Sequence, residues 1–167
     1  VVDLNNGVYL EEEVKNPGNA QFCIGVAGYP EKHFEAPNIA TDVAYLKAKV
    51  DAGADYVVTQ MFFNNQKYFE FVDACRAAGI TVPIIPGLKP ITNKKQMSVL
   101  PRIFHVDLPT DLSAEITKCK TDADVELVGT EWLLQQSREL KAAHVPVLHY
   151  YTLGKPKVIW NVVKELV

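Results

Sequence analysis

Two apolar runs joined by a helical segment constrain the fold of this chain more than any other feature. The first run, residues 22–29, stops at Pro30, which cannot donate a ladder hydrogen bond and biases Tyr29 toward an extended conformation. The second run, residues 56–63, is almost entirely apolar, which is typical of a parallel strand covered on both faces. The segment between them carries Ile39, Val43, Leu46 and Val50 at helical spacing, and Gly53 supplies a helix stop. The pattern predicts a parallel α/β fold, in which loops at the carboxyl ends of strands bind ligands.

The helical segment carries a polar flank, and the second strand carries one amide. Asp42, Tyr45 and Lys49 fall about a quarter turn from the apolar stripe, because helical residues advance by about 100° each. Spacing alone favours an ordinary solvated flank. Gln60 interrupts the apolar strand, and a buried amide without a partner costs about 1–3 kcal/mol. Its partner is either a neighbouring backbone group or a heterocyclic ligand, and both remain open.

Three motifs in a fixed order resemble the methylenetetrahydrofolate reductase family: YPEKH at residues 29–33, KVDAGAD at 49–55 and TQMFF at 59–63. The resemblance continues through IIPGLKPITNKKQ, RIFHVDLP and HYYTLGK, almost to the end of the chain. It implies a (β/α)8 TIM-type barrel. It also implies a flavoenzyme in which FAD, reduced by NADH or NADPH, converts 5,10-methylenetetrahydrofolate to 5-methyltetrahydrofolate, in one-carbon and methionine metabolism.

The same resemblance implies two sets of site residues. The positions that match contacts to FAD are Tyr29, His33, Ala36, Asp42, Tyr45, Ala48 and Lys49. The positions that match the folate site are Gln60, Gln96, Tyr151 and Lys155. Asp42 is expected to accept from a ribityl or ribose hydroxyl, and Lys49 to neutralise phosphate charge. Lys155 stands where the family generally has arginine, so it keeps the charge but loses the planar fork, and Tyr45 and Ala48 replace more polar side chains.

The length of 167 residues accounts for only part of such a barrel. A complete (β/α)8 barrel takes about 250 residues, and about 200 is the lower limit. The strand candidates are residues 22–29, 56–63, 82–88 and 147–152, with a further short segment at 103–106, and residues 122–143 form a long helix candidate. We therefore expect residues 1–167 to be one partial domain, the C-terminal half of the barrel, lacking the N-terminal βα units.

No catalytic residue is assigned within the chain. Residues 1–10 resemble a helix end followed by a turn, so the family's catalytic acid is expected upstream of Val1. Glu31, Glu35 and Glu70 are candidate replacements, but nothing in their sequence context marks them as buried carboxylates of raised pKa. We expect the isolated chain to bind FAD weakly and to turn over nothing. Its open sheet edge favours pairing with another chain, as in a homo-oligomer.

Composition excludes several other classes of protein. Twenty acidic and seventeen basic side chains give a net charge of −3, without a basic run that could follow nucleic acid or an anionic membrane. Three widely spaced cysteines without clustered histidines indicate neither a disulfide framework nor a metal site, and they suit a cytoplasmic protein. No apolar segment reaches the ~18–20 residues of a membrane span. Two alternatives stay open: another flavin-binding barrel oxidoreductase, such as a proline dehydrogenase-like protein, and a non-catalytic barrel fragment that acts as a binding or assembly module.

Overall fold

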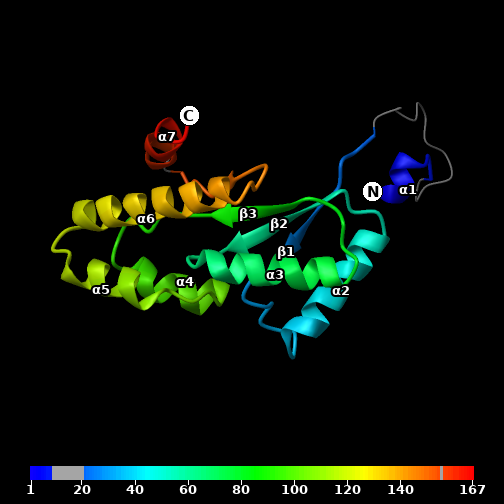
Figure 1. Cartoon of the computed structure of the whole chain (residues 1–167), viewed down its shortest axis with the longest axis horizontal. Helices are drawn as coiled ribbons and strands as arrows, with labels where there is room; N and C mark the ends of the chain where they lie inside the picture. Colours follow the sequence, from blue (N-terminus) through cyan, green and yellow to red (C-terminus); the bar gives the residue numbers. More distant parts are fainter. Residues whose placement is uncertain (9–20, 155) are drawn as a thin grey trace.

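The strands form one parallel sheet in chain order. We analysed a computed structural model of the chain, which describes residues 1–8, 21–154 and 156–167. The strands are β1 (Gly25–Gly28), β2 (Tyr56–Met61), β3 (Ile84–Leu88) and β4 (His149–Tyr150). Each strand pairs in parallel with the next one, in the order β1-β2-β3-β4 (Figure 1). The predicted class, an α/β fold with a parallel sheet, is therefore confirmed.

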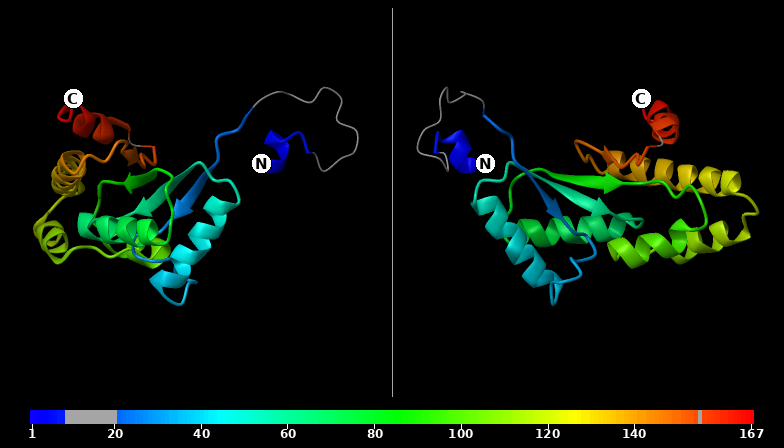
Figure 2. Two further views of the ribbon diagram at one scale, coloured as in Figure 1. Left: turned by 45° about the vertical axis from the view of Figure 1, so that its right-hand side comes forward. Right: turned by 180° about the vertical axis from the view of Figure 1, so that it is seen from behind.

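The helices that follow β1 gather on one side of the sheet. The helices of the chain are α1 (Val2–Asn5), α2 (Ile39–Asp51), α3 (Asn65–Ala77), α4 (Gln96–Phe104), α5 (Thr110–Lys118), α6 (Asp122–Ala142) and α7 (Pro156–Lys164). Contacts run from α2 to α3, from α3 to α6 and from α6 to α7, so these helices follow the order of the strands (Figure 2). Among the described residues, no helix combines the length and the apolar character needed to cross a bilayer.

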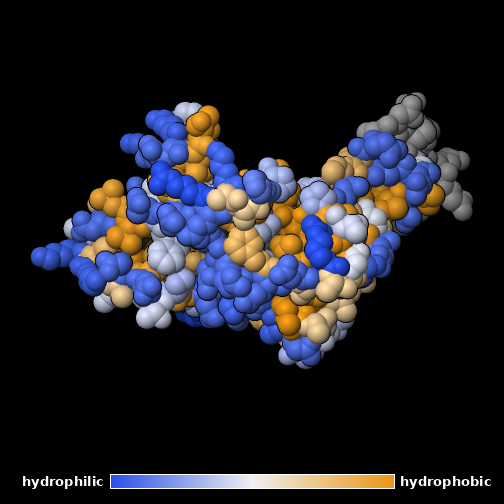
Figure 3. All heavy atoms as spheres, viewed as in Figure 1, coloured by the Kyte–Doolittle hydropathy of each residue, from blue (hydrophilic) through white to orange (hydrophobic). Residues whose placement is uncertain are grey.

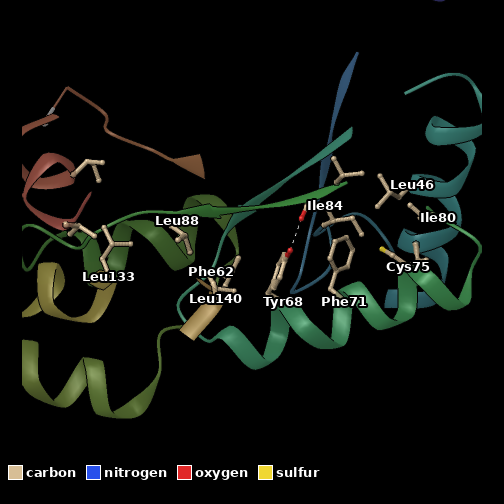
Figure 4. Close-up of a cluster of buried hydrophobic side chains, with 14 of the residues drawn as sticks. Leu46, Phe62, Tyr68, Phe71, Cys75, Ile80, Ile84, Leu88, Leu133 and Leu140 are labelled. Atoms are coloured by element: carbon tan, nitrogen blue, oxygen red, sulfur yellow. Dashed lines mark hydrogen bonds between the residues drawn. The ribbon is translucent and has the colours of Figure 1, made fainter. Parts of the chain in front are cut away.

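The main core lies between the sheet and its helices (Figure 4). Phe62, Tyr68 and Phe71 are at most 3% exposed and fill the space under β2 and β3. The Tyr68 hydroxyl donates to the Ile84 carbonyl oxygen at 2.7 Å, so this buried polar group has a partner. Burying each such side chain contributes about 1.5–3 kcal/mol. The core therefore holds α3 against the two central strands.

A second core supports the helices that follow β3. It contains Met61, Phe63, Ile91, Leu100, Val106, Leu112, Ile116 and Val125. The helix α6 approaches the chain after β3 so closely that a Cβ atom at Gly129 would lie 1.9 Å from the Ile91 carbonyl oxygen. Only glycine fits at this contact. The position of Ile91, and of the chain that leads to α4, thus depends on α6.

Each predicted strand is longer than the observed one: the candidates 56–63, 82–88 and 147–152 correspond to Tyr56–Met61, Ile84–Leu88 and His149–Tyr150. The first strand begins at Gly25 rather than at Phe22, because the Asn5 side chain bonds both the Phe22 amide and the Phe22 carbonyl at 2.8 Å. It also ends at Gly28, one residue before Tyr29. The proposed segment at 103–106 is wrong, since Phe104 ends α4 and His105 adopts a left-handed conformation with φ of 54°.

The prediction that the second strand is covered on both faces is also wrong within this chain. The burial of β2 alternates, with Val57 fully buried and Tyr56 and Val58 half-buried. The neighbouring β1 keeps Gly25 and Ala27 exposed. Apolar surface is correspondingly visible around β1 and α2 in the space-filling view (Figure 3). The physical reason is that the helices cover only one side of the sheet.

Candidate functional site

The loop after β1 brings four of the predicted FAD residues together. The rings of Tyr29 and His33 meet edge to face, with centroids 4.6 Å apart. The His33 amide donates to Asp42 Oδ2 at 2.8 Å, which ties the loop to the first turn of α2. Lys32, at a φ of 75°, donates from Nζ to the carbonyl oxygens of His33 and Ala36 at 3.0 and 2.6 Å. The loop is therefore folded around its own polar contacts, with the aromatic pair at its base.

The other predicted FAD residues lie apart from this cluster. Tyr45 is 58% exposed, and the side chains of Ala48 and Lys49 are exposed on α2. No hydrogen bond or ion pair joins the Tyr45 or Lys49 side chain to another described residue. These three side chains are thus accessible on the surface of α2, and those of Tyr45 and Lys49 have no polar partner within the described chain.

Both predicted folate glutamines use their amide oxygen inside the protein. Gln60 Oε1 accepts from the Met61 amide at 2.9 Å, so of the two alternatives the backbone partner is the one observed. Gln96 Oε1 accepts from the Thr92 amide at 2.8 Å, at the start of α4. Each glutamine is half-buried, and its Nε2 group donates no hydrogen bond to another described residue. Both side chains can therefore offer two N–H donors to a ligand.

Tyr151 follows β4 and reaches across the sheet. Its hydroxyl donates to the Thr59 carbonyl oxygen at 2.9 Å, and its amide donates to the Leu88 carbonyl at 2.8 Å. Burial raises the pKa of the Tyr151 phenol, and the nearby Tyr29 phenol raises it further. Tyr151 thus lies close to Tyr29, and its hydroxyl is bonded to the protein. Lys155 lies outside the described residues.

A small gap joins the ends of β1 and β2 to the end of α4. It has a volume of about 10 Å³, and Tyr29, Gln60 and His105 are among its lining residues. The exposed ring of Phe34 stacks on His105, with centroids 4.8 Å apart and planes inclined by 23°. The loop after β1 therefore closes onto the carboxyl end of α4, and Gln60 faces this junction.

Glu31 also lines this gap, and sequence reasoning considered it as an acid but assigned it no role. Its Oε2 accepts from the Asp107 amide at 2.8 Å, and its Oε1 is buried without a hydrogen-bond partner among the described residues. Burial raises the pKa of Glu31 to about 7; the Asp107 amide opposes this shift, the Asp107 carboxylate adds to it, and Lys67 lowers it. The expectation that no candidate acid has a raised pKa is therefore wrong for Glu31. The contact spans 76 positions, so the local sequence carried no signal of it.

These observations define a class of protein: a parallel α/β fold that gathers aromatic and amide side chains at the carboxyl ends of successive strands, as barrel enzymes do. The family follows from the sequence. The family model described as methylenetetrahydrofolate reductase matches residues 4–167, and the chain belongs to this family.

Relatives of known name agree with that assignment. The chain is 37% identical over 160 residues to a Caenorhabditis elegans protein named probable methylenetetrahydrofolate reductase (NADPH), with 95% of this chain and 24% of the relative covered. It is 37% identical over 148 residues to the 5,10-methylenetetrahydrofolate reductase of Salmonella typhimurium, with 88% of this chain and 50% of the relative covered. The chain therefore spans half the length of the bacterial relative and a quarter of the nematode one.

A solved structure shares the fold. It is an uncharacterized protein from Clostridium thermocellum whose title states that it binds two copies of 5-methyl-5,6,7,8-tetrahydrofolic acid. The TM-score is 0.55 at 15% sequence identity, with 84% of this chain and 51% of the other chain covered. At this identity the likeness concerns the fold alone.

Proposed function

We propose that this chain is part of a flavin-dependent reductase that converts 5,10-methylenetetrahydrofolate to 5-methyltetrahydrofolate with NADH or NADPH. The single observation that carries the proposal is the placement of the Gln60 amide at the end of β2, beside Tyr29 and with free N–H donors. A pterin ring offers acceptors that match such donors. The family match and the name of the Salmonella relative supply the reaction.

The folate would lie over the ends of β2, β3 and β4. Gln60 presents N–H donors at the end of β2, Gln96 presents them at the start of α4, the helix that follows β3, and Tyr151 follows β4. We further propose that the four-stranded sheet is the C-terminal half of a (β/α)8 barrel, because its parallel strands and their helices follow one another in chain order. In such a barrel the ligand would sit in the mouth formed by the strand ends.

The described residues fit FAD by their chemistry. The loop after β1 offers the aromatic pair of Tyr29 and His33, and α2 offers an exposed cation at Lys49 and a small side chain at Ala48. Asp42 holds the loop through the His33 amide, and its second oxygen can accept from a ligand hydroxyl. FAD, when bound, would supply the hydride transfer between the nicotinamide and the folate.

The remaining expectations form part of the same proposal. Three free cysteines suit a reducing, cytoplasmic location. The exposed backbone of β1 suits pairing with a further strand or a second copy of the protein. The isolated chain is expected to bind FAD weakly and to be inactive.

The test is NAD(P)H oxidation by the purified full-length protein, with and without 5,10-methylenetetrahydrofolate, followed by product analysis. Folate-dependent oxidation with formation of 5-methyltetrahydrofolate supports the proposal, whereas folate-independent turnover would indicate another flavin-dependent oxidoreductase. A parallel titration follows flavin fluorescence in the wild type and in Asp42→Ala and Lys49→Ala. Lys47→Ala is the matched control, since it removes a cation that pairs with Asp51 on the same helix. Equal FAD affinity in all four proteins would refute the placement of FAD on α2.

A further inference from the structure

We infer that Tyr151, together with Thr59 and Gly87, is a positioning group that holds an irregularity in β2 and thereby sets the direction in which Gln60 presents its amide. This inference rests on the proposed role of Gln60 in folate binding. It assigns Tyr151 a task different from direct contact with the ligand.

The irregularity lies directly before the end of β2. The strands pair Val58 with Ile85 and then Met61 with Gly87, so β2 has one more residue than β3 between these pairs. The extra residue belongs to the Thr59-Gln60 step, which is a β-bulge. Bulges bend a strand and redirect its side chains, and they are common next to active sites. Here the redirected side chain is that of Gln60.

The ladder between β2 and β3 is irregular at this step. The Gly87 amide points toward β2 but donates to the Thr59 side chain instead of a backbone carbonyl. Pro86 precedes Gly87, and prolines inside sheets are confined to edges, strand starts and bulges. The backbone groups around the bulge must therefore find other partners, because buried and unpaired groups cost free energy. Thr59 is fully buried, so water does not reach its groups.

Side chains replace the missing ladder bonds. The Gly87 amide donates to Thr59 Oγ1 at 2.9 Å, and the Thr59 carbonyl accepts from the Tyr151 hydroxyl at 2.9 Å. The Met61 amide donates to Gln60 Oε1 at 2.9 Å. Through these three bonds the bulge is satisfied, and the Gln60 amide oxygen is fixed while its nitrogen stays available.

Gly87 makes room for the Tyr151 ring. A Cβ atom at this position would lie 2.2 Å from the Thr59 carbonyl oxygen and 2.7 Å from the Tyr151 ring. The Tyr151 amide bond to the Leu88 carbonyl anchors the other end of the residue. The ring therefore crosses β3 in direct contact with its backbone, and the hydroxyl reaches β2. Because that hydroxyl already donates to Thr59, it has no proton left to donate to a ligand.

The test compares two adjacent tyrosines in the full-length protein loaded with FAD. Tyr151→Phe removes the hydroxyl that bonds Thr59, and Tyr150→Phe removes a hydroxyl that instead donates to Ser137 Oγ at 2.9 Å. The expected result is that Tyr151→Phe weakens binding of 5-methyltetrahydrofolate about fivefold to tenfold, as loss of one buried hydrogen bond does. Tyr150→Phe should leave this affinity unchanged, and neither variant should change FAD affinity.

A double-mutant cycle with Gln60→Ala tests whether Tyr151 acts through Gln60. In the Gln60→Ala background, Tyr151→Phe should have no further effect on folate affinity. Additive effects would overturn the positioning role, because Tyr151 would then act without Gln60. If Gln60→Ala alone leaves folate affinity unchanged, the proposed role of Gln60 fails and this inference fails with it.

Hydrogen exchange gives a readout that needs no folate. The Met61 and Gly87 amides should exchange faster in Tyr151→Phe than in the wild type or in Tyr150→Phe, because the bulge loses one of its bonds. Unchanged exchange at both amides would overturn the inference even if folate binding is lost. Thr59→Val is a second variant, which removes the acceptor of the Gly87 amide and keeps the branched shape. It should raise exchange at Gly87 as well.

Discussion

The strand-end residues and the α2 flank are both proposed ligand surfaces, and the protein holds them differently. At the strand ends, Gln60, Gln96 and Tyr151 are each joined to a backbone group by a hydrogen bond of 2.8–2.9 Å. On α2, Tyr45 and Lys49 are exposed, and no polar contact joins their side chains to the described residues. The first surface is oriented before a ligand arrives, whereas the second would be ordered by the ligand itself.

This difference predicts how substitutions divide between stability and binding. Changes at or behind the strand ends should lower the free energy of unfolding and the affinity for ligands together, because the same bonds serve both. Changes on the α2 flank should affect FAD affinity and leave stability nearly unchanged, as is usual for exposed positions. The predictions below test this division.

The largest expected effect comes from Gly129→Ala, behind the strand ends. The new Cβ atom would lie 1.9 Å from the Ile91 carbonyl oxygen, so α6 must move away from the chain that leads to Gln96. We expect a loss of about 3 kcal/mol or more in urea unfolding, the upper range for overpacking. Glu131→Ala, at an exposed position of the same helix, should change stability by less than about 0.5 kcal/mol. Equal midpoints for the two variants would mean that α6 does not constrain this region.

Glu31→Gln should change stability in a pH-dependent way. The folded pKa of about 7 exceeds the ordinary value of 4.5, so the folded state binds the proton more tightly. The wild type therefore loses stability as pH rises from 4.5 to about 7 and stays at the lower value above that range. The charged groups around Glu31 are Lys32, Lys67, Glu70 and Asp107; the Asp107 carboxylate raises the pKa of Glu31 and Lys67 lowers it.

Glutamine cannot ionise, so the variant should be more stable than the wild type at pH 8 and nearly equal to it at pH 4. After allowance for solvent screening of this partly exposed group, we expect a difference of about 1–2 kcal/mol at pH 8. Thermal unfolding at several pH values measures it. Glu35→Gln is the control, since Glu35 is exposed. A constant difference between variant and wild type across pH would contradict the assignment of the raised pKa.

Asn38→Ala, at the start of α2, should have a smaller effect on the free energy of unfolding. The Asn38 side chain accepts from the Thr41 amide at 2.9 Å and caps the helix. Loss of such a cap costs about 1 kcal/mol. Asn161→Ala, at an exposed position inside α7, should cause no loss in the same denaturation assay. If both variants unfold at the wild-type midpoint, the cap does not contribute to stability.

The smallest effect on stability is expected for Tyr45→Ala, on the α2 flank. Because Tyr45 is 58% exposed, we expect a change within about 0.5 kcal/mol in urea unfolding. FAD affinity should nevertheless fall, since the ring is proposed to contact the cofactor. A stability loss above about 1 kcal/mol without a change in FAD affinity would make Tyr45 a packing residue and would remove the contrast between the two surfaces.

Local patterns in the sequence were sufficient for much of the fold. Apolar periodicity predicted a helix through Ile39, Val43, Leu46 and Val50 and a long helix at 122–143, which the structure bounds as Ile39–Asp51 and Asp122–Ala142. The capping box of Thr121 and Asp124 defines the start of α6 through contacts between neighbouring residues. The first strand was predicted too long because the partner of Phe22 is the side chain of Asn5, which lies outside the strand pattern.

In the candidate site, too, the sequence motifs named some residues, and the structure alone showed how others are held. The family motifs named Tyr29, His33, Gln60 and Tyr151, and the structure places these residues at the ends of β1, β2 and β4. The motifs did not show that Glu31, which is half-buried, accepts a hydrogen bond from the Asp107 amide. Nor did they show that Gln60 sits on a bulge.

By itself, then, the sequence determined the family, the parallel α/β class and the approximate places of the four strands along the chain. Motifs, periodicity and turn residues suffice for this because they act over a few neighbouring positions. Only the tertiary structure decided the pKa of Glu31 and the support of Gln60. Glu31 depends on a backbone amide 76 positions away, and the Thr59 bulge depends on a hydroxyl 92 positions away. Burial and hydrogen bonding between such distant groups exist only once the chain has folded, so no local pattern records them.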